Sequence, residues 1–445
     1  MLESLFKFEE NGTNLKTEIL AGITTFLAMS YILGVNPTML AEGGMSTSGV
    51  FFATAISSGI ACIIMGLIAK YPFGLAPGMG HNALFTYTII IMMGNTWETA
   101  LAATFISSIL FLLITISGLT NTILDIIPID LKLGIGAGIG FLLIFIGLQD
   151  CGIIIDDLST LVSMGHLLSA HALLALIGIF ITIILYVQKI PSAIFIGLVL
   201  NTVLGLIFTT LGFGTGNELM PSISPEIITT NIDTSLFLGF VRGFQGLFSN
   251  IHNVIIIIFS LVFLSFFDTT GTFVSLGKQG GFIDENGKIK RVEKAFIGNA
   301  IAGMLSSIFG TSPLTTYLES SAGIGMGGRT GLTAIVTGTL FLLSLLFAPI
   351  VISLFTPSVT VVALVLIGLL MIRQLKEVNW EDNIVLVSVP MTIAMMIFSY
   401  SISLGIAWGF ITYVIATIAT GKIREISWAM WILFIVFVIF LLFGL

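Results

Sequence analysis

The sequence predicts an all-α polytopic membrane protein with 14 transmembrane segments, arranged as a 7+7 inverted repeat with broken helices 3 and 10. Three observations predict this fold. Of the 445 residues, 56% are hydrophobic and only 9% are charged, whereas a soluble domain carries about 25% charged residues. Long apolar runs recur along the whole chain. Two of these runs are interrupted by Gly and Pro at matching positions.

Fourteen apolar runs are long enough to cross a bilayer, or nearly so, since a full span needs about 20 residues. A further run at 427–444 either crosses the membrane or lies at its interface. The first run lacks a cleavage site of small residues, which indicates a retained span and not a signal peptide. The fourteen runs fall at roughly 17–38, 50–69, 77–93, 99–118, 132–149, 170–188, 191–211, 250–276, 294–309, 313–326, 330–353, 358–373, 383–398 and 403–421.

The distribution of Lys and Arg predicts the orientation. With a cytoplasmic N-terminus, these residues lie on the cytoplasmic side, and only Arg242, in the long 212–249 loop, lies outside. This asymmetry agrees with the positive-inside rule for membrane proteins. We therefore expect a multi-pass protein of the cell (plasma) membrane, with an even number of crossings before residue 422.

A short sequence match supports the repeat. Residues 73–78 (Phe-Gly-Leu-Ala-Pro-Gly) and 309–314 (Phe-Gly-Thr-Ser-Pro-Leu) share Phe, Gly and Pro at the same spacing. Each stands where the second and third segments of its half meet. Seven crossings separate the halves, so the second copy has inverted topology. Paired interrupted helices of this kind mark the substrate site in many secondary transporters.

Two acidic residues, Asp268 and Glu319, stand inside predicted spans. A carboxylate at mid-bilayer costs about 2.5–3.5 kcal/mol on insertion scales, so each should face protein or water. Either each acid only bonds to nearby hydroxyl groups, such as that of Thr269, or it serves transport. A carboxyl group held away from water can exchange a proton near neutral pH. When ionised, it accepts hydrogen bonds from the N–H groups of a planar heterocycle. Both properties suit a proton-coupled symporter.

The third segment, residues 76–87, offers the facing wall of such a site. Asn82 carries both a donor and an acceptor, which suit the edge of a base. Phe85 could stack on a ring, although an aromatic residue in a span more often serves packing. His81 is either a satisfied structural histidine or part of the site, and a lone histidine is weak evidence for a metal.

Other functions lack their sequence signals. Cys62 and Cys151 are the only cysteines, which disfavours a disulfide framework or a metal cluster. No His-Glu-x-x-His or Gly-x-Ser-x-Gly motif supports an intramembrane enzyme, and no basic patch suits nucleic acid. An anion carrier of the sulfate permease type would need a positive site, but neither broken helix contains Lys or Arg. We expect no cofactor or metal, and H⁺ as the coupling ion.

Several motifs together resemble those of the AzgA-like purine permeases. They are residues 21–32 (Ala-Gly-Ile-Thr-Thr-Phe-Leu-Ala-Met-Ser-Tyr-Ile), 76–83 (Ala-Pro-Gly-Met-Gly-His-Asn-Ala), 266–272 (Phe-Phe-Asp-Thr-Thr-Gly-Thr), 310–320 (Gly-Thr-Ser-Pro-Leu-Thr-Thr-Tyr-Leu-Glu-Ser) and 327–334 (Gly-Gly-Arg-Thr-Gly-Leu-Thr-Ala). The resemblance covers essentially the whole chain. This family is similar to the uracil and xanthine permeases of the wider nucleobase–cation symporter group, so a carrier of those bases is an alternative.

The resemblance implies uptake of adenine, guanine or hypoxanthine with protons, by a homodimer in membrane lipid whose core domain moves like an elevator. The implied core domain comprises helices 1–4 (15–120) and 8–11 (247–353). The implied gate domain comprises helices 5–7 (129–211) and 12–14 (357–421), and an extra C-terminal helix occupies 425–445.

The resemblance also assigns residues by motif position. Asp268 matches the helix-8 acid, Glu319 the helix-10 acid, Asn82 the helix-3 asparagine, and Tyr317 the aromatic position two residues before the helix-10 acid. One of the two acids would also carry the proton. His81 departs from the family, where we expect a more apolar residue in many relatives. The candidate substrate-binding residues are Asp268, Glu319, Asn82, Tyr317, Phe85 and Thr269, and the candidate proton-coupling residues are Asp268 and Glu319.

Overall fold

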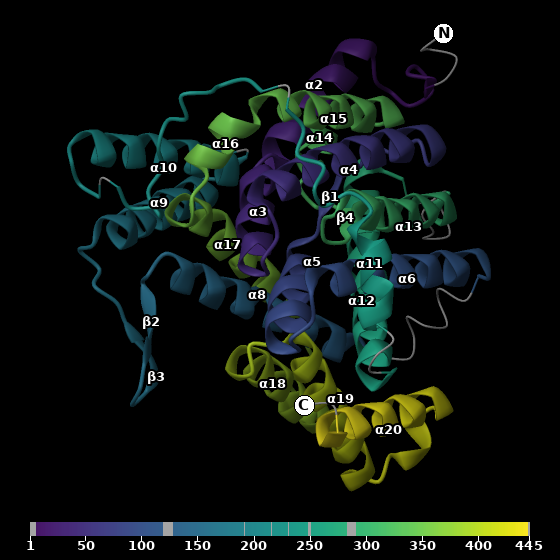
Figure 1. Ribbon diagram of the computed structural model, residues 1–445. Coiled ribbons are helices and arrows are strands. Elements are labelled where there is room, and N and C mark those ends of the chain that lie inside the picture. Colours follow the sequence, from purple (N-terminus) through teal and green to yellow (C-terminus); the bar gives the residue numbers. More distant parts are fainter. Residues whose placement is uncertain are drawn as a thin grey trace.

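The computed structural model of the protein describes residues 6–118, 128–190, 192–214, 216–229, 231–247, 251–282 and 291–443. It is built mainly of helices (Figure 1), ten of which, within the described residues, are long and apolar enough to cross a membrane. The prediction of a mostly helical, polytopic membrane protein is confirmed. The count of fourteen crossings stays a prediction. The expected domain limits at 120 and 445 lie outside the described residues, as do Lys288 and Lys290.

The first half of the described chain combines helices with three short strands. Side chains of Asn14, Ser46 and Thr96 accept hydrogen bonds from the first turns of α2, α4 and α6 and so fix where these helices begin. The elements are α2 (Leu15–Met29), α3 (Ile32–Glu42), α4 (Thr47–Ile68), β1 (Leu75–Pro77), α5 (Met79–Ala83), the π-helix η1 (Leu84–Met92), α6 (Trp97–Ile116), α8 (Ile129–Asp150), β2 (Ile154–Asp157), β3 (Leu161–Met164), α9 (Ala170–Val187) and α10 (Ala193–Thr210).

The second half contains one further strand. The side chains of Thr330, Asp382 and Ser401 cap the beginnings of α15, α18 and α19. The elements are α11 (Gly239–Leu247), α12 (Ile251–Gly280), α13 (Val292–Phe309), β4 (Leu314–Thr316), α14 (Ser320–Gly325), α15 (Gly331–Ser344), η2 (Leu345–Phe347), α16 (Ala348–Leu354), α17 (Pro357–Ile372), η3 (Arg373–Glu377), α18 (Asn383–Phe398), α19 (Ile402–Ala419), η4 (Ile423–Glu425) and α20 (Trp428–Phe443).

The expectation of a purely helical chain is wrong in one respect, because the chain contains two small antiparallel sheets. Strands β2 and β3 form a hairpin at 154–164 that projects from the helices (Figure 1). Strands β1 and β4 pair deep inside, with Ala76 opposite Thr315. Strand β1 lies within the first Phe-Gly-x-x-Pro match and β4 directly follows the second, where the chain is extended. Pairing with each other satisfies backbone groups that neither lipid nor a helix would satisfy at that depth.

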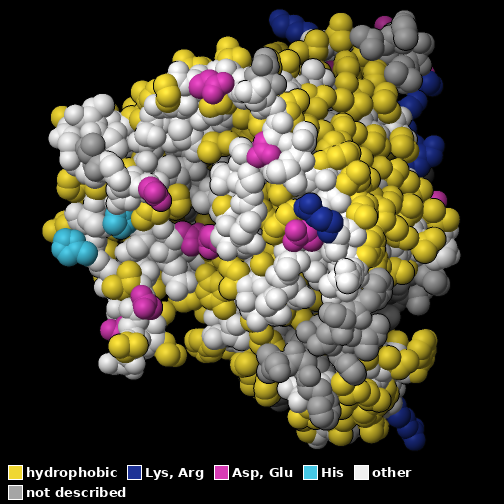
Figure 2. Space-filling model, viewed as in Figure 1, with side chains coloured by type: hydrophobic (Ala, Val, Ile, Leu, Met, Phe, Trp, Pro, Cys, Tyr) yellow, Lys and Arg dark blue, Asp and Glu magenta, His cyan; other side chains and the backbone are white. Residues whose placement is uncertain are grey.

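The helices pack in two groups. In one, α8 lies against α17 and α18, α9 and α10 lie against α17, and α19 lies against α18. In the other, α15 lies against α2 and α4, and α6 lies against α11, α12 and α13. The β1–β4 sheet belongs to this second group. Hydrophobic side chains cover broad areas of the face in Figure 2, as expected of a surface in contact with lipid.

Candidate substrate site

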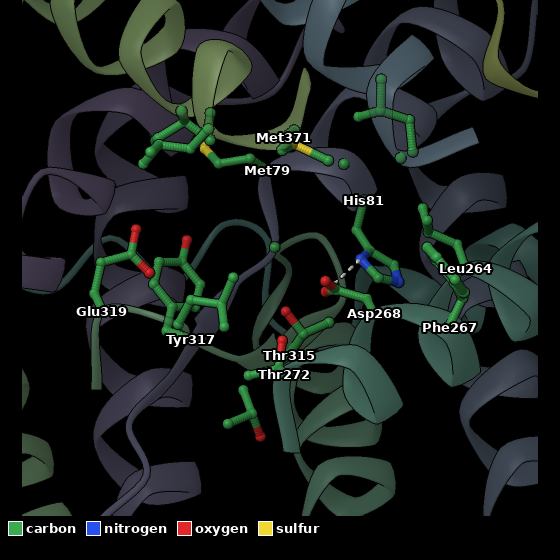
Figure 3. Close-up of a pocket in the computed structure, with 18 of the residues that line it drawn as sticks. Met79, His81, Leu264, Phe267, Asp268, Thr272, Thr315, Tyr317, Glu319 and Met371 are labelled. Carbon is green, nitrogen blue, oxygen red and sulfur yellow. Dashed lines mark ion pairs between the residues drawn. The ribbon is translucent and has the colours of Figure 1, made fainter. Parts of the chain in front are cut away.

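A cavity of about 290 Å³ lies between the two groups of helices. This volume is at the lower end of the range for small-molecule sites, about 300–1,000 Å³. The group that contains the β1–β4 sheet contributes most of the polar lining (Figure 3). Apolar residues of α8, α10 and α17 cover the opposite side, together with Gln374 of η3.

The inner strands bring the two interrupted segments to this cavity. After β1 the chain passes through Gly78 into α5, and after β4 it passes through Tyr317 and Glu319 into α14. The Gly78 N–H donates to the Pro313 carbonyl, with 3.1 Å between nitrogen and oxygen. A Cβ atom on Gly78 would lie 2.8 Å from Thr315 Oγ1 and 2.9 Å from His81 Nδ1. Glycine is therefore required for the two segments to approach so closely.

Glu319 is held by aromatic neighbours. The Tyr31 hydroxyl donates to Glu319 Oε1 over 2.8 Å. The Tyr31 and Tyr317 rings lie 6.2 Å apart, and the Tyr317 hydroxyl donates to the carbonyl of Pro77. A hydrogen bond to a charged group is stronger than one between neutral groups, so Tyr31 stabilises the ionised form of Glu319 and fixes its direction.

Asp268 approaches the cavity from α12. Its side chain is 38% exposed, and Oδ2 lies 4.0 Å from Nδ1 of His81, whose own side chain is almost completely buried. The other ring nitrogen of His81, Nε2, lies 3.0 Å from Ser265 Oγ. Thr272 and Thr315 lie beside Asp268 (Figure 3) and add hydroxyl groups to this wall.

The structure brings together three of the residues predicted for the site. Asp268, Tyr317 and Glu319 all line the cavity. They come from α12, from the residue after β4, and from the residue before α14.

The other three predicted residues lie behind the lining. Asn82 is fully buried, and its Oδ1 accepts a 2.6 Å hydrogen bond from Ser312 Oγ. Phe85 is fully buried in η1. Thr269 accepts a hydrogen bond from Asn299 Nδ2 over 2.9 Å. In this structure they support the walls of the cavity.

Sequence reasoning missed several residues of the lining. Tyr31 falls within the 21–32 motif that resembles the purine permeases, but a tyrosine near the end of an apolar run does not by itself indicate a binding site. Gln374 follows an apolar run and is typical of a span end. Phe267 and Met371 are lining residues of ordinary apolar type. Only the packing of one group of helices on the other places these four residues at one cavity.

Charge gives the cavity its chemical character. Its lining contains two carboxyl groups, and no lysine or arginine lies among the lining residues that the structure describes. Within the described part of the chain, no group of three or more His, Cys, Asp or Glu side chains is placed to hold a metal ion. The arrangement suits a ligand that offers several N–H donors.

Comparison with known proteins identifies the chain as a membrane transport protein, not an enzyme. Residues 16–406 match the model of the Permease family, and the chain therefore belongs to this family. It is 39% identical over 434 residues to the guanine/hypoxanthine permease PbuG of Bacillus subtilis, covering 96% of each chain. It is 38% identical over 427 residues to the adenine permease AdeP of Escherichia coli, covering 96% of this chain and 93% of that one. The resemblance drawn from the motifs is confirmed.

A solved structure shows the same fold. The transmembrane domain of a cyanobacterium bicarbonate transporter, BicA, matches with a TM-score of 0.65 at 17% sequence identity. The match covers 90% of this chain and 97% of that one. At this level of identity the likeness concerns the fold alone.

Proposed function

We propose that this protein takes up purine nucleobases (adenine, guanine or hypoxanthine) together with protons. One observation carries the proposal. Two carboxyl groups, Asp268 and Glu319, line a cavity without lysine or arginine among its described lining residues, in a chain whose relatives include permeases named for guanine, hypoxanthine and adenine.

Purine chemistry suits this lining. A purine presents N–H groups along its edges, and an ionised carboxylate accepts hydrogen bonds from such donors. Asp268 and Glu319 would bind the base, and one of them would carry the coupled proton. The Tyr317 and Phe267 rings give flat apolar surfaces beside the two acids. Asn82, Phe85 and Thr269 would act one layer further out, on the walls that hold these groups.

An anion carrier on the same scaffold is the alternative. The fold does not separate the two functions, since a bicarbonate transporter shares it. Against an anion carrier stands the charge of the lining, since two carboxyl groups without a described cation repel an anion. A carrier of uracil or xanthine would suit the same hydrogen-bonding groups and is distinguished only by a substrate panel.

Alternating access would follow from the two groups of helices. We assign the group with the β1–β4 sheet to the core domain (15–120 and 247–353) and the other to the gate domain (129–211 and 357–421), in a fourteen-crossing, 7+7 inverted repeat. With a cytoplasmic N-terminus, Met371 and Gln374 mark the cytoplasmic end of α17, so the cavity faces inward. The core would carry the base across the membrane as an elevator in each subunit of a homodimer.

Contacts between the two groups support closure of the outer side. The Tyr87 and Tyr400 rings meet edge to face with their centres 5.4 Å apart, and the Ile402 N–H donates to Thr88 Oγ1 over 3.1 Å. Within the core group, the Tyr87 hydroxyl donates to Glu42 Oε1 over 3.0 Å. An inward-facing transporter needs such a seal between the site and the outside.

Uptake of radiolabelled bases in a transport-deficient host tests the proposal. The panel contains adenine, guanine, hypoxanthine, uracil, xanthine and sulfate, each with and without a proton uncoupler. Asp268→Ala and Glu319→Ala should abolish purine uptake at equal membrane abundance. Glu226→Ala, which removes a carboxylate from an exposed loop, serves as the control. Normal uptake in both cavity variants would remove these acids from the site, and uptake of sulfate without purines would favour the anion carrier.

A further inference from the structure

His81 has one ring nitrogen in use and one without a partner. Its side chain is completely buried at the start of α5. Nε2 lies 3.0 Å from Ser265 Oγ, whereas the buried Nδ1 has no hydrogen-bond partner among the described residues. Buried polar atoms are normally satisfied, so an unpaired one in a binding site calls for a functional explanation.

The nearest acceptor for this nitrogen is Asp268. The 4.0 Å separation between Nδ1 and Oδ2 exceeds the 2.7–3.2 Å of a hydrogen bond by about 1 Å. Asp268 is partly exposed to the cavity and can turn, while His81 is fixed by its burial and by Ser265. The absence of a side chain on Gly78 keeps open the space beside Nδ1, where a Cβ atom would come within 2.9 Å.

Among the described residues, the cavity lining offers Asp268 no cation. The other titratable groups on the cavity lining are Tyr31 at the start of α3, Tyr317 after β4, and Glu319 before α14. The facing helix α8 presents only Gly136 and Ile139, and η3 presents the neutral Gln374. An ionised Asp268 in an empty cavity therefore depends on neutral hydrogen-bond donors.

We infer that His81 is a positioning residue that stabilises the ionised Asp268 carboxylate when no purine is bound. The ring carries its hydrogen on Nδ1 and donates it to Oδ2, while the lone pair of Nε2 accepts a hydrogen bond from the Ser265 hydroxyl. The side chains of Ser265, His81 and Asp268 are then joined by two successive hydrogen bonds. When a base binds, its N–H donors and the coupled proton satisfy Asp268, and the carboxyl group turns away from His81.

This inference rests on the proposed function and concerns one step of the cycle. Net uptake requires the transporter to release its proton inside and return empty, with Asp268 ionised. Exchange of one purine for another uses only loaded, protonated transporter in both directions. Loss of the His81 donor should therefore impair net uptake and spare exchange.

The experiment compares these two modes in proteoliposomes of purified protein. Net uptake of radiolabelled hypoxanthine, adenine or guanine is driven by a pH gradient, and exchange is measured at equal pH with unlabelled base inside. His81→Leu should lower net uptake at least about tenfold, the effect of a lost charge-assisted hydrogen bond, and change exchange by less than about threefold. His81→Asn, whose amide can place a donor near the position of Nδ1, should restore net uptake.

Two controls make the result specific. His166→Leu removes an exposed histidine outside the cavity and should change neither mode. Wild-type protein must exchange purines, since its failure to do so would overturn the proposed function and not the role of His81. Equal loss of net uptake and exchange in His81→Leu would overturn the inference in favour of a role in binding or folding. Unchanged net uptake would overturn it outright.

Discussion

The two segments that meet at the β1–β4 sheet begin alike and end differently. Both start with Phe-Gly-x-x-Pro and form a three-residue strand, within this match in the first segment and directly after it in the second. The first continues through α5 and the π-helix η1, nearly all of it buried, and contains no Asp, Glu, Lys or Arg. The second reaches the six-residue α14 within a few residues and places Glu319 at the cavity.

This difference indicates that the two segments have different roles. Apart from His81, which lines the cavity, the first segment keeps its polar side chains inside the protein, as when Asn82 bonds to Ser312. The second presents a carboxyl group to the ligand. Substitutions in the second segment should therefore act on transport, and those in the first mainly on the integrity of the site.

The largest effect is expected from neutralising the charge on the second segment. Glu319→Gln keeps the size of the side chain but lowers its strength as an acceptor. Loss of a hydrogen bond to a charged group costs about 1.5–3 kcal/mol, which corresponds to a fall in purine affinity of about 10- to 100-fold. Calorimetric titration of purified protein measures this change. Glu319→Gln with unchanged affinity would mean that the segment supports the site without touching the base.

The next effect is expected where the first segment approaches the second most closely. Gly78→Ala places a methyl group 2.8 Å from Thr315 Oγ1 and 2.9 Å from His81 Nδ1. Overpacking of this kind costs about 1–3 kcal/mol, and uptake should fall about tenfold. Gly271→Ala on α12, where a Cβ would meet nothing within 4 Å, is the matched control. If both variants transport like the wild type, the close approach at Gly78 has no role in the site.

Local sequence patterns are enough to predict the membrane class, the interruption of two segments by glycine and proline, and the two acids, Asp268 and Glu319, that line the cavity. Charged residues in spans and glycine–proline interruptions cost free energy when they face lipid, so the sequence alone indicates that they face protein or water. The pairing of β1 with β4 was not predictable, because Ala76 and its partner Thr315 lie 239 positions apart in the sequence.

The site residues that the sequence did not predict have the same explanation, because their positions depend on contacts between distant segments. Asn82 lies one layer behind the cavity lining, which its residue type could not predict, because an asparagine suits both a base edge and a buried amide. Only its 2.6 Å bond to Ser312 distinguishes the two. Tyr31 and Gln374 were missed because polar residues near span ends are common, and their approach to the cavity depends on how the two groups of helices pack.

Removing the amide of the first segment should act on stability. Asn82→Ala leaves the buried Ser312 hydroxyl with only its longer 3.2 Å contact to Asn36 Oδ1. Such a loss costs about 1–3 kcal/mol, and thermal unfolding in detergent should shift downward. Ser312→Ala should give a similar shift, and the double variant less than the sum, since both remove one interaction. A loss of purine affinity in Asn82→Ala with no loss of stability would instead place Asn82 in direct contact with the base.

The smallest effect is expected at Cys62, which supports the first strand from α4. Its Sγ accepts a hydrogen bond from Leu75 N–H at 3.1 Å and lies 3.3 Å from the Leu75 carbonyl, to which it donates. The second segment supplies a stronger acceptor, since Ser320 Oγ accepts from Gly74 N–H at 2.9 Å.

Sulfur is a weak hydrogen-bond partner, so Cys62→Ala should cost about 1 kcal/mol of stability and Ser320→Ala more. Thermal unfolding of both variants tests this order. Cys62→Ser, which keeps a donor and an acceptor, should recover the wild-type stability. Destabilisation by Cys62→Ser equal to that by Cys62→Ala would show that packing around the sulfur, and not its hydrogen bonds, supports the strand.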